Sequence, residues 1–201
     1  MKRKIIYTVL ILLLLIGGGL IGTSIYVKYE TKVQENDMIQ QYINSENNKT
    51  NIVSDTSKKE IKNTQNNLES NSTTKDVIGI IEIPSIGVKA PIVEGTTWDD
   101  MKYAVGHFDN TAEPGEKGNT CFAAHDNIYG DIFSDLSKVK NGEKIIVDYN
   151  GEKYMYEITS QTIVKPDNVS VLEKTKDATM TLVTCTPGAT ERIIVKAKII
   201  Q

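Results

Sequence analysis

The chain has 201 residues, of which 39% are hydrophobic and 24% are charged, and its formal net charge is -3. This balance is ordinary for a globular domain, and so small a charge argues against a nucleic-acid-binding protein. Two cysteines are too few for a disulfide scaffold, and only two arginines, Arg3 and Arg192, occur.

The first segment with a clear pattern is a basic tip, Lys2 to Lys4, followed by an uncharged run from Ile5 to Val27. About 20 apolar residues suffice to cross a bilayer. The positive-inside rule then puts the tip in the cytoplasm and everything after Lys28 outside. Residues 1–28 are therefore predicted to be a transmembrane signal anchor. A cleaved signal peptide is the alternative, with Gly22 at the start of a candidate cleavage region.

Residues 29–76 change to a composition dominated by Asn, Ser, Thr, Gln, Lys and Glu. Such a segment buries too little apolar surface to offset the entropy of ordering it. We predict a flexible extracellular tether, in which 33–43 could continue the preceding helix.

Residues 77–201 read as one β-rich domain, long enough to build a single core. Short strands are predicted at 77–84, 87–94, 120–124, 144–149, 153–158, 180–184 and 192–200. Asn150-Gly151 joins the predicted strands 144–149 and 153–158 in a tight hairpin turn. Short helices are predicted to start at Thr97 and to cover 131–139 and 169–174. Many short strands separated by turn residues are typical of a closed or nearly closed β-barrel.

The stretch around Cys185 carries the strongest chemical signal. A β-branched strand ends at this thiol, Pro187-Gly188 forms a turn, and the final strand begins at Arg192. If the two strands pair, the guanidinium can approach the thiol, where it would stabilise a thiolate or a developing oxyanion. The alternative is a buried, inert cysteine.

The segment Thr181-Leu182-Val183-Thr184-Cys185, with Arg192 seven residues later, resembles the Thr-Leu-x-Thr-Cys signature of sortases, the cysteine transpeptidases of Gram-positive bacteria. The likeness extends over the domain, through 82–88, 105–119 and 133–136, and it is greatest to class D sortases. The resemblance implies a sortase-type closed β-barrel of about eight strands with short helices.

The resemblance also implies the roles of single residues. Cys185, His125 and Arg192 correspond to the catalytic residues of the family, and Thr184 and Thr181 are expected to line the substrate site. His125 follows a buried strand and faces a loop, although a solvated loop histidine is the commoner case for a lone His. Many relatives have Gly before this histidine and Arg after it, whereas Ala124 and Asp126 occupy those positions here.

The sequence also contains a second histidine and a second cysteine, which we interpret differently from His125 and Cys185. His107 corresponds to an upstream histidine that is not the usual acid or base of the family. Cys121 is read as buried and structural. A disulfide between Cys121 and Cys185 would disable the nucleophile, so the enzyme hypothesis predicts free thiols.

By this resemblance the protein is a membrane-anchored transpeptidase that cleaves a Leu-Pro-x-Thr-type sorting signal in secreted proteins. A thioester on Cys185 is then transferred to an amine of a peptidoglycan precursor. The catalytic domain is expected outside a single-pass anchor in the cell membrane. No cofactor, metal or nucleic acid is predicted.

Three alternatives differ in chemistry. An L,D-transpeptidase is discounted because nothing like its Ser-His-Gly-Cys cluster surrounds Cys185. A pilin-polymerising sortase would use a lysine of another pilin as acceptor. Such enzymes often carry an N-terminal lid, and the tether has no obvious Asp-Pro-aromatic anchor for one. A membrane-tethered β-barrel binding module would carry an unreactive Cys185.

Overall fold

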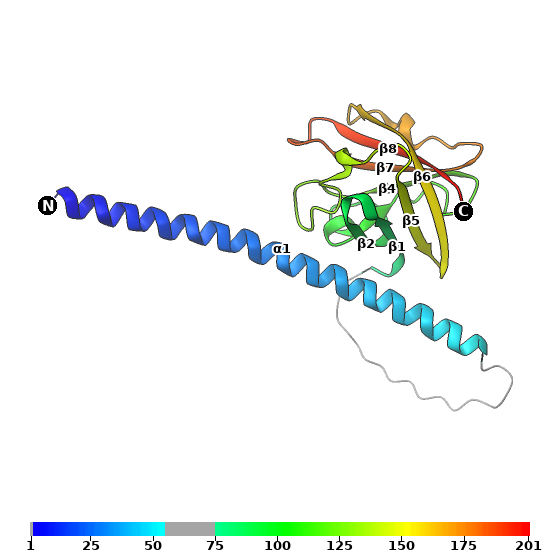
Figure 1. Cartoon of the computed structure of the whole chain (residues 1–201), viewed down its shortest axis with the longest axis horizontal. Helices are drawn as coiled ribbons and strands as arrows, with labels where there is room; N and C mark the ends of the chain where they lie inside the picture. The colour runs from blue at the N-terminus through cyan, green and yellow to red at the C-terminus, as the bar shows by residue number, and fades with distance from the viewer. Residues whose placement is uncertain (1, 55–74) are drawn as a thin grey trace.

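The computed structural model describes the backbone of residues 2–54 and 75–201, and in the N-terminal helix it describes the side chains of Tyr7, 12–15, Gly17 and 22–49. A single long helix, α1 (Lys2–Ser54), lies beside a β-barrel and projects far beyond it (Figure 1). The predicted tether residues 55–74 lie outside the described residues.

Eight strands form the closed barrel in the order β1-β2-β3-β4-β7-β8-β6-β5, with β5 pairing back onto β1. The strands are β1 (Val77–Ile83), β2 (Val88–Glu94), β3 (Val105–His107), β4 (Gly118–Ala123), β5 (Lys144–Tyr149), β6 (Glu152–Val164), β7 (Ala178–Cys185) and β8 (Arg192–Ile199). The β2–β3 and β4–β7 pairs are parallel, and the others are antiparallel. The predicted barrel is confirmed.

The barrel interior is filled by side chains from alternate strand positions, as expected for strands with one face on a core. Its largest fully buried members include Phe122, Tyr156 and Leu182, and Phe133 closes it from a loop. Because the inward positions of β4 and β7 are taken by these core residues, their other positions face outward, where a site can form.

The predicted short helices are wrong in length. In those regions the structure has only 3-10 turns, η2 (Asp100–Lys102), η3 (Leu136–Lys138) and η4 (Val169–Leu172). A further 3-10 turn, η1 (Pro84–Ile86), joins β1 to β2. Leu136 and Phe133 are buried in the core. Their burial needs only one turn of helix, and the flanking residues follow the barrel surface instead.

Residues 29–54 belong to α1, so the helix includes the range 33–43 that could continue it and extends beyond that range into the predicted tether. Three side chains explain this difference. Met38 packs with Val93, and Ile39 and Tyr42 pack with Ile80. The Tyr42 hydroxyl also donates to Asp148 Oδ1 at 2.9 Å. The polar composition of the segment concealed a narrow apolar stripe with helical spacing, which the barrel covers.

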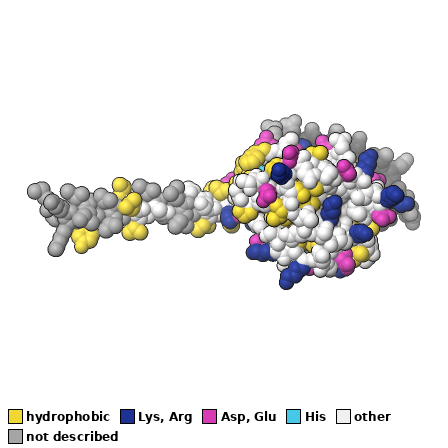
Figure 2. Space-filling model, turned by 90° about the horizontal axis from the view of Figure 1, so that it is seen from above, with side chains coloured by type: hydrophobic (Ala, Val, Ile, Leu, Met, Phe, Trp, Pro, Cys, Tyr) yellow, Lys and Arg dark blue, Asp and Glu magenta, His cyan; other side chains and the backbone are white. Residues whose placement is uncertain are grey.

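The first half of α1 projects away from the barrel as an exposed rod (Figure 2). Among its described side chains, apolar and aromatic groups such as Leu14 and Tyr26 are largely exposed. Judged on the described residues, none of the helices combines the length and the apolar character needed to span a membrane.

Gly115 gives a test of the barrel's packing. Its φ is +87°, and a Cβ there would lie 2.2 Å from Tyr154 Cε1. We expect Gly115→Ala to lower the free energy of unfolding by about 2 to 4 kcal/mol, because backbone strain and overpacking add. Urea unfolding followed by circular dichroism measures this loss.

Gly142→Ala is the matched control for that prediction. Gly142 has nearly the same φ, +89°, but among the described residues no atom other than those of Gly142 and its two chain neighbours lies within 4 Å of its ideal Cβ. It should lose about 1 kcal/mol, the strain contribution alone. Equal losses in the two variants would contradict the predicted clash with Tyr154.

Candidate active site

Two strand ends meet at one end of the barrel. β4 and β7 are parallel neighbours in a register that pairs Ala123 with Val183. The Ala124 amide donates to the Val183 carbonyl at 3.2 Å, so the pairing continues past the end of β4. Continuing this register by two residues would set His125 opposite Cys185. The alternation of side chains along the two strands then predicts that the thiol and the imidazole share the outward face.

Arg192 approaches from the other side of the thiol. It is the register partner of Cys185 in the antiparallel β7–β8 pair. The connecting turn is closed by the Thr186 amide, which donates to the Glu191 carbonyl at 3.0 Å. The Arg192 guanidinium donates to the carbonyls of Ala189 and Glu191, at 3.2 and 3.0 Å. These exposed bonds hold the cation at the rim, where a substrate oxygen could replace a carbonyl partner.

The two predicted substrate-lining threonines are both buried. The Thr184 hydroxyl donates to the Ala124 carbonyl at 2.8 Å. The Thr181 hydroxyl donates to Asn119 Oδ1 at 2.8 Å. Asn119 in turn donates from Nδ2 to the carbonyls of Val171 and Glu173. Thr184 thus fastens the end of β4 to β7, and Thr181 supports the residue that holds the β6–β7 loop.

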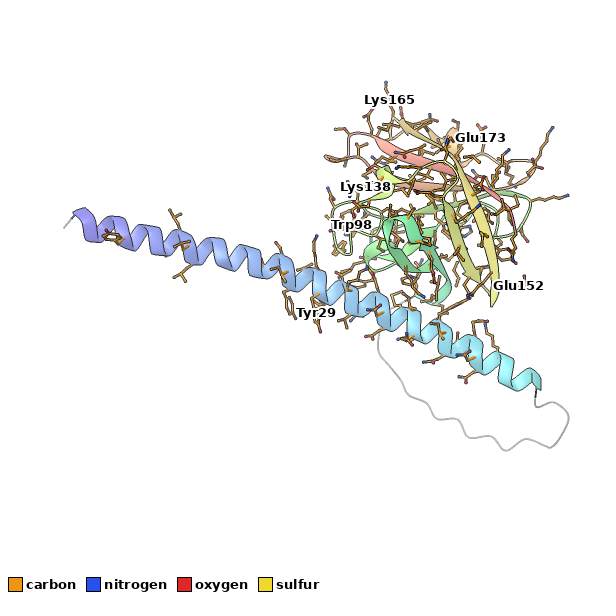
Figure 3. The ribbon with its side chains drawn as sticks, in the orientation of Figure 1. Tyr29, Trp98, Lys138, Glu152, Lys165 and Glu173 are labelled. Carbon is orange, nitrogen blue, oxygen red and sulfur yellow. The ribbon has the colours of Figure 1, made fainter. Side chains whose placement is uncertain are left out.

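Trp98 covers His125, a contact that the sequence did not predict. The two ring centroids are 4.8 Å apart at an interplanar angle of 57°. Trp98 Nε1 also donates to the Tyr129 hydroxyl at 3.0 Å. Trp98 is 57% exposed, and Figure 3 shows it at the edge of the barrel toward the N-terminal half of α1. The one feature of the sequence that could have drawn attention to Trp98 is that it is the sole tryptophan of the chain.

The covered imidazole is in an environment that disfavours its charged form. Burial lowers the pKa of His125, and the nearby carboxylate of Asp126 opposes this shift. Among the described residues, His125 Nε2 is buried and has no hydrogen-bond partner. A ring nitrogen that no protein group engages can exchange a proton with a reacting group.

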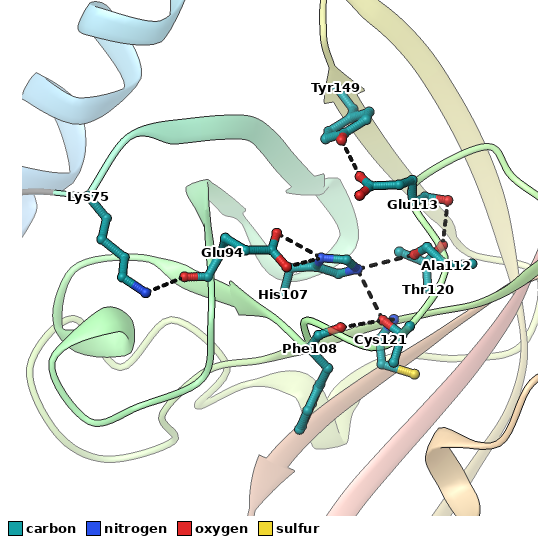
Figure 4. A network of polar contacts seen from close by, with 10 residues as sticks. Lys75, Glu94, His107, Phe108, Ala112, Glu113, Thr120, Cys121 and Tyr149 are labelled. Carbon is teal, nitrogen blue, oxygen red and sulfur yellow. Dashed lines mark hydrogen bonds and ion pairs between the residues drawn. The ribbon is translucent and has the colours of Figure 1, made fainter.

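His107 is held in a different way. It is 1% exposed, and its Nδ1 lies 3.0 Å from Glu94 Oε2. Its Nε2 lies 3.1 Å from the Ala112 carbonyl and 3.0 Å from Thr111 Oγ1 (Figure 4). With both nitrogens engaged, this histidine fixes the β3–β4 connection and has no free position for a substrate.

An open hollow of about 480 Å³ lies between the β2–β3 connection, the β3–β4 connection and η4. Phe108 and Leu172 give it apolar walls, and Thr97 and Asn110 add polar groups. Across residues 2–54 and 75–201, no three His, Cys, Asp or Glu side chains lie together in a way that could hold a metal ion.

The two cysteines are free thiols in contrasting environments. Cys121 is fully buried, and burial raises its pKa to about 12. Cys185 is partly exposed. Because a thiolate is the reactive form and a reagent needs access, we expect iodoacetamide at pH 7 to alkylate Cys185 alone. Peptide mass mapping measures the sites.

The control for this labelling is the Cys185→Ala variant. It should take up no reagent while folded and one equivalent at Cys121 after unfolding in urea. Modification of Cys121 in the folded protein would contradict its burial.

Comparisons with known proteins agree with this geometry. The family model for the sortase domain matches residues 81–200. The chain is 31% identical to sortase A of Bacillus anthracis over 187 residues, covering 92% of this chain and 88% of that protein. It is 31% identical to sortase D of Bacillus subtilis (strain 168) over 132 residues, which are 62% of this chain and 65% of that protein.

Among solved structures, the chain is similar to a Clostridium perfringens sortase D5 transpeptidase. The TM-score is 0.63 at 33% sequence identity, and the match covers 87% of this chain and 99% of that one. A family model that matches most of the chain, together with this likeness over nearly all of a relative, leads to one assignment: this chain belongs to the sortase family of cysteine transpeptidases.

Proposed function

We propose that this sortase cleaves a Leu-Pro-x-Thr-type sorting signal and transfers the signal-bearing protein to an amine of the cell wall. The observation that carries the proposal is the register of β7, which pairs it in parallel with β4 and antiparallel with β8. That register supports a shared site for a thiol, an imidazole and a guanidinium at one end of the barrel.

In the first half of the reaction, Cys185 attacks the carbonyl carbon of the signal's Thr as a thiolate. Arg192 donates hydrogen bonds to the carbonyl oxygen as it gains negative charge. The C–N bond then breaks, and His125 as imidazolium gives its proton to the leaving amine. The products are a thioester on Cys185 and a released C-terminal fragment.

In the second half, an acceptor amine attacks the thioester carbonyl and loses a proton to His125. A new amide bond forms and the Cys185 thiolate leaves, so the enzyme returns to its starting state. Thr184 and Thr181 act indirectly in this proposal. The first holds the end of β4 against β7, and the second supports the β6–β7 loop through Asn119.

We also propose that α1 anchors the enzyme in the cell membrane with the barrel outside. The support comes from the sequence, because residues Ile5 to Val27 carry no formal charge and follow the basic tip Lys2 to Lys4. At about 1.5 Å per residue this run is about 35 Å long, enough for a hydrocarbon core of about 30 Å. Tyr26 and Tyr29 are exposed at its outer end, as aromatic residues are at membrane interfaces.

A cleavage assay tests the function. We expect the full chain in detergent to cleave a quenched peptide bearing Leu-Pro-Gln-Thr-Gly or Leu-Pro-Gln-Thr-Ala. An added amine should be joined to the new Thr carboxyl end, as mass spectrometry can detect. Comparing a cell-wall stem peptide with a lysine peptide as acceptor separates wall attachment from pilin polymerisation. Absence of cleavage with both peptides, together with an unreactive Cys185, would favour a binding module.

A further inference from the structure

The loop that follows His125 is held from two sides. On one side the Tyr129 hydroxyl accepts a hydrogen bond from Trp98. On the other side α1 contacts the next two residues, Gly130 and Asp131. The loop is also tied to the histidine itself, because the Phe133 amide donates to the His125 carbonyl at 3.0 Å.

The backbone of this loop is strained at two non-glycine residues. Tyr129 has φ +54° and Asp131 has φ +51°, with Gly130 between them. Residues other than glycine adopt such values uncommonly, and a bulky side chain such as that of Tyr129 does so at a cost. Trp98 contacts the loop at Tyr129, and α1 contacts it at Gly130 and Asp131.

The contact from α1 centres on Glu35. Its side chain is 1% exposed, and Oε2 pairs with Lys32 Nζ at 2.5 Å. Among the described residues, Oε1 has no hydrogen-bond partner. This oxygen lies 2.0 Å from where a Cβ on Gly130 would be, so it packs directly on the glycine. About one helical turn earlier, Thr31 is buried against the same loop, and about two turns earlier Lys28 Nζ pairs with Asp131 Oδ2 at 2.7 Å.

We propose that Glu35 and Lys28 are positioning residues of the active site, and that α1 keeps His125 in place by clamping the loop at Gly130 and Asp131. With the loop clamped, Tyr129 stays within reach of Trp98, and Trp98 stays over the imidazole. The expected change in kcat on loss of the clamp rests on the proposed role of His125 as the acid. The expected displacement of His125 and Trp98 does not rest on that role.

Loosening the clamp has two consequences. The imidazole moves relative to the reacting atoms, which lowers kcat, whereas the strand pairing that positions Cys185 and Arg192 is unchanged, so we expect KM to be retained. Trp98 also covers His125 less, so the pKa of His125 rises toward its usual value of about 6.5. The other titratable groups facing the stack are Asp126 on the loop, Tyr129, and Lys102, whose Nζ lies 5.5 Å from the centre of the Tyr129 ring.

The decisive experiment is a double-mutant cycle in the full chain. Gly130→Ala places a methyl group 2.0 Å from the present position of Glu35 Oε1 and 3.0 Å from Thr31 Cγ2, so the Glu35 carboxylate must leave its place against the loop. We expect kcat to fall about tenfold at unchanged KM, because small displacements of a catalytic group are costly. Glu35→Ala alone leaves the contact between α1 and the loop unfilled, so it should also lower kcat. In the Glu35→Ala/Gly130→Ala double variant the new methyl group occupies the space that the carboxylate leaves, so most of the loss should be recovered.

A second readout does not depend on catalysis. Trp98 is the sole tryptophan, and an imidazolium in contact with an indole quenches its fluorescence more than a neutral imidazole does. We expect the wild-type emission to titrate with a midpoint below about 6.5. Gly130→Ala should move the midpoint upward, and the double variant should move it back. His125→Gln identifies the titrating group, because the transition should disappear.

The outcomes separate the possibilities. If Gly130→Ala changes neither kcat nor the midpoint, or if Glu35→Ala fails to rescue it, the clamp is overturned. If the fluorescence midpoint rises in Gly130→Ala and falls again in the double variant, while His125→Gln cleaves peptide normally, the clamp stands. The proposed role of His125 as the acid then fails.

Discussion

Replacing Cys185 by alanine is expected to abolish cleavage and transfer of a sorting peptide, with kcat reduced by about 10³-fold or more. The variant has no sulfur atom that can form the thioester, and water is a much weaker nucleophile than a thiolate. The partly exposed position at the end of β7 tolerates the smaller side chain, so the fold is retained. Peptide cleavage and mass spectrometry of the trapped acyl-enzyme measure the effect.

The matched control is Cys121→Ala. Its thiol is buried beneath the β6–β7 loop and its Sγ lies 3.7 Å from the Asn119 carbonyl. Removing it should cost about 1 kcal/mol of stability through a small cavity, with kcat unchanged under conditions where the variant is folded. Full activity in Cys185→Ala would show that the nucleophile lies elsewhere.

The second large effect is expected from His125→Gln, with a fall in kcat of about 10²- to 10⁴-fold for an amide substrate. The leaving amine needs a proton, and glutamine cannot supply one. An ester substrate, in which an oxygen replaces the nitrogen after the signal's Thr, has a better leaving group. We therefore expect the loss to be much smaller with the ester in a side-by-side kinetic comparison.

His107→Gln is the control for that comparison. His107 is enclosed by Glu94, Thr111 and Ala112, so its replacement should lower the unfolding temperature and leave the amide-to-ester ratio unchanged. An equal loss with amide and ester in His125→Gln would mean that the imidazole acts in some step other than leaving-group protonation.

Much of the barrel follows from local sequence. Asn150 and Gly151 both have positive φ, as a tight hairpin requires, and the strands they join were predicted there. The β-branched run before Cys185 and the strand after Arg192 were predicted nearly to their ends. These elements are set by alternation and turn chemistry within a few residues, which a sequence displays directly.

The features that were missed depend on contacts distant in the sequence. β3 has three residues and is a strand only because β2 and β4 lie on either side. The sequence allowed a helix over 33–43, but not its continuation to Ser54 or its docking, which depends on Met38, Ile39 and Tyr42 meeting the barrel. The position of Trp98 over His125 joins two loops and has no local signature. The candidate site was predictable as a set of residue types, but its cover and its support were not.

The parallel pairing of β4 with β7 also has a kinetic consequence for biogenesis. The two strands are separated in the chain by the whole β5–β6 hairpin, so their pairing must overcome a large loop-closure entropy. β8 must then enter between β7 and β6 before the sheet can close. Before β7 pairs with β4 and β8, the register that sets Arg192 opposite Cys185 does not exist. We therefore expect the cysteine of a partly folded chain to react as an ordinary thiol.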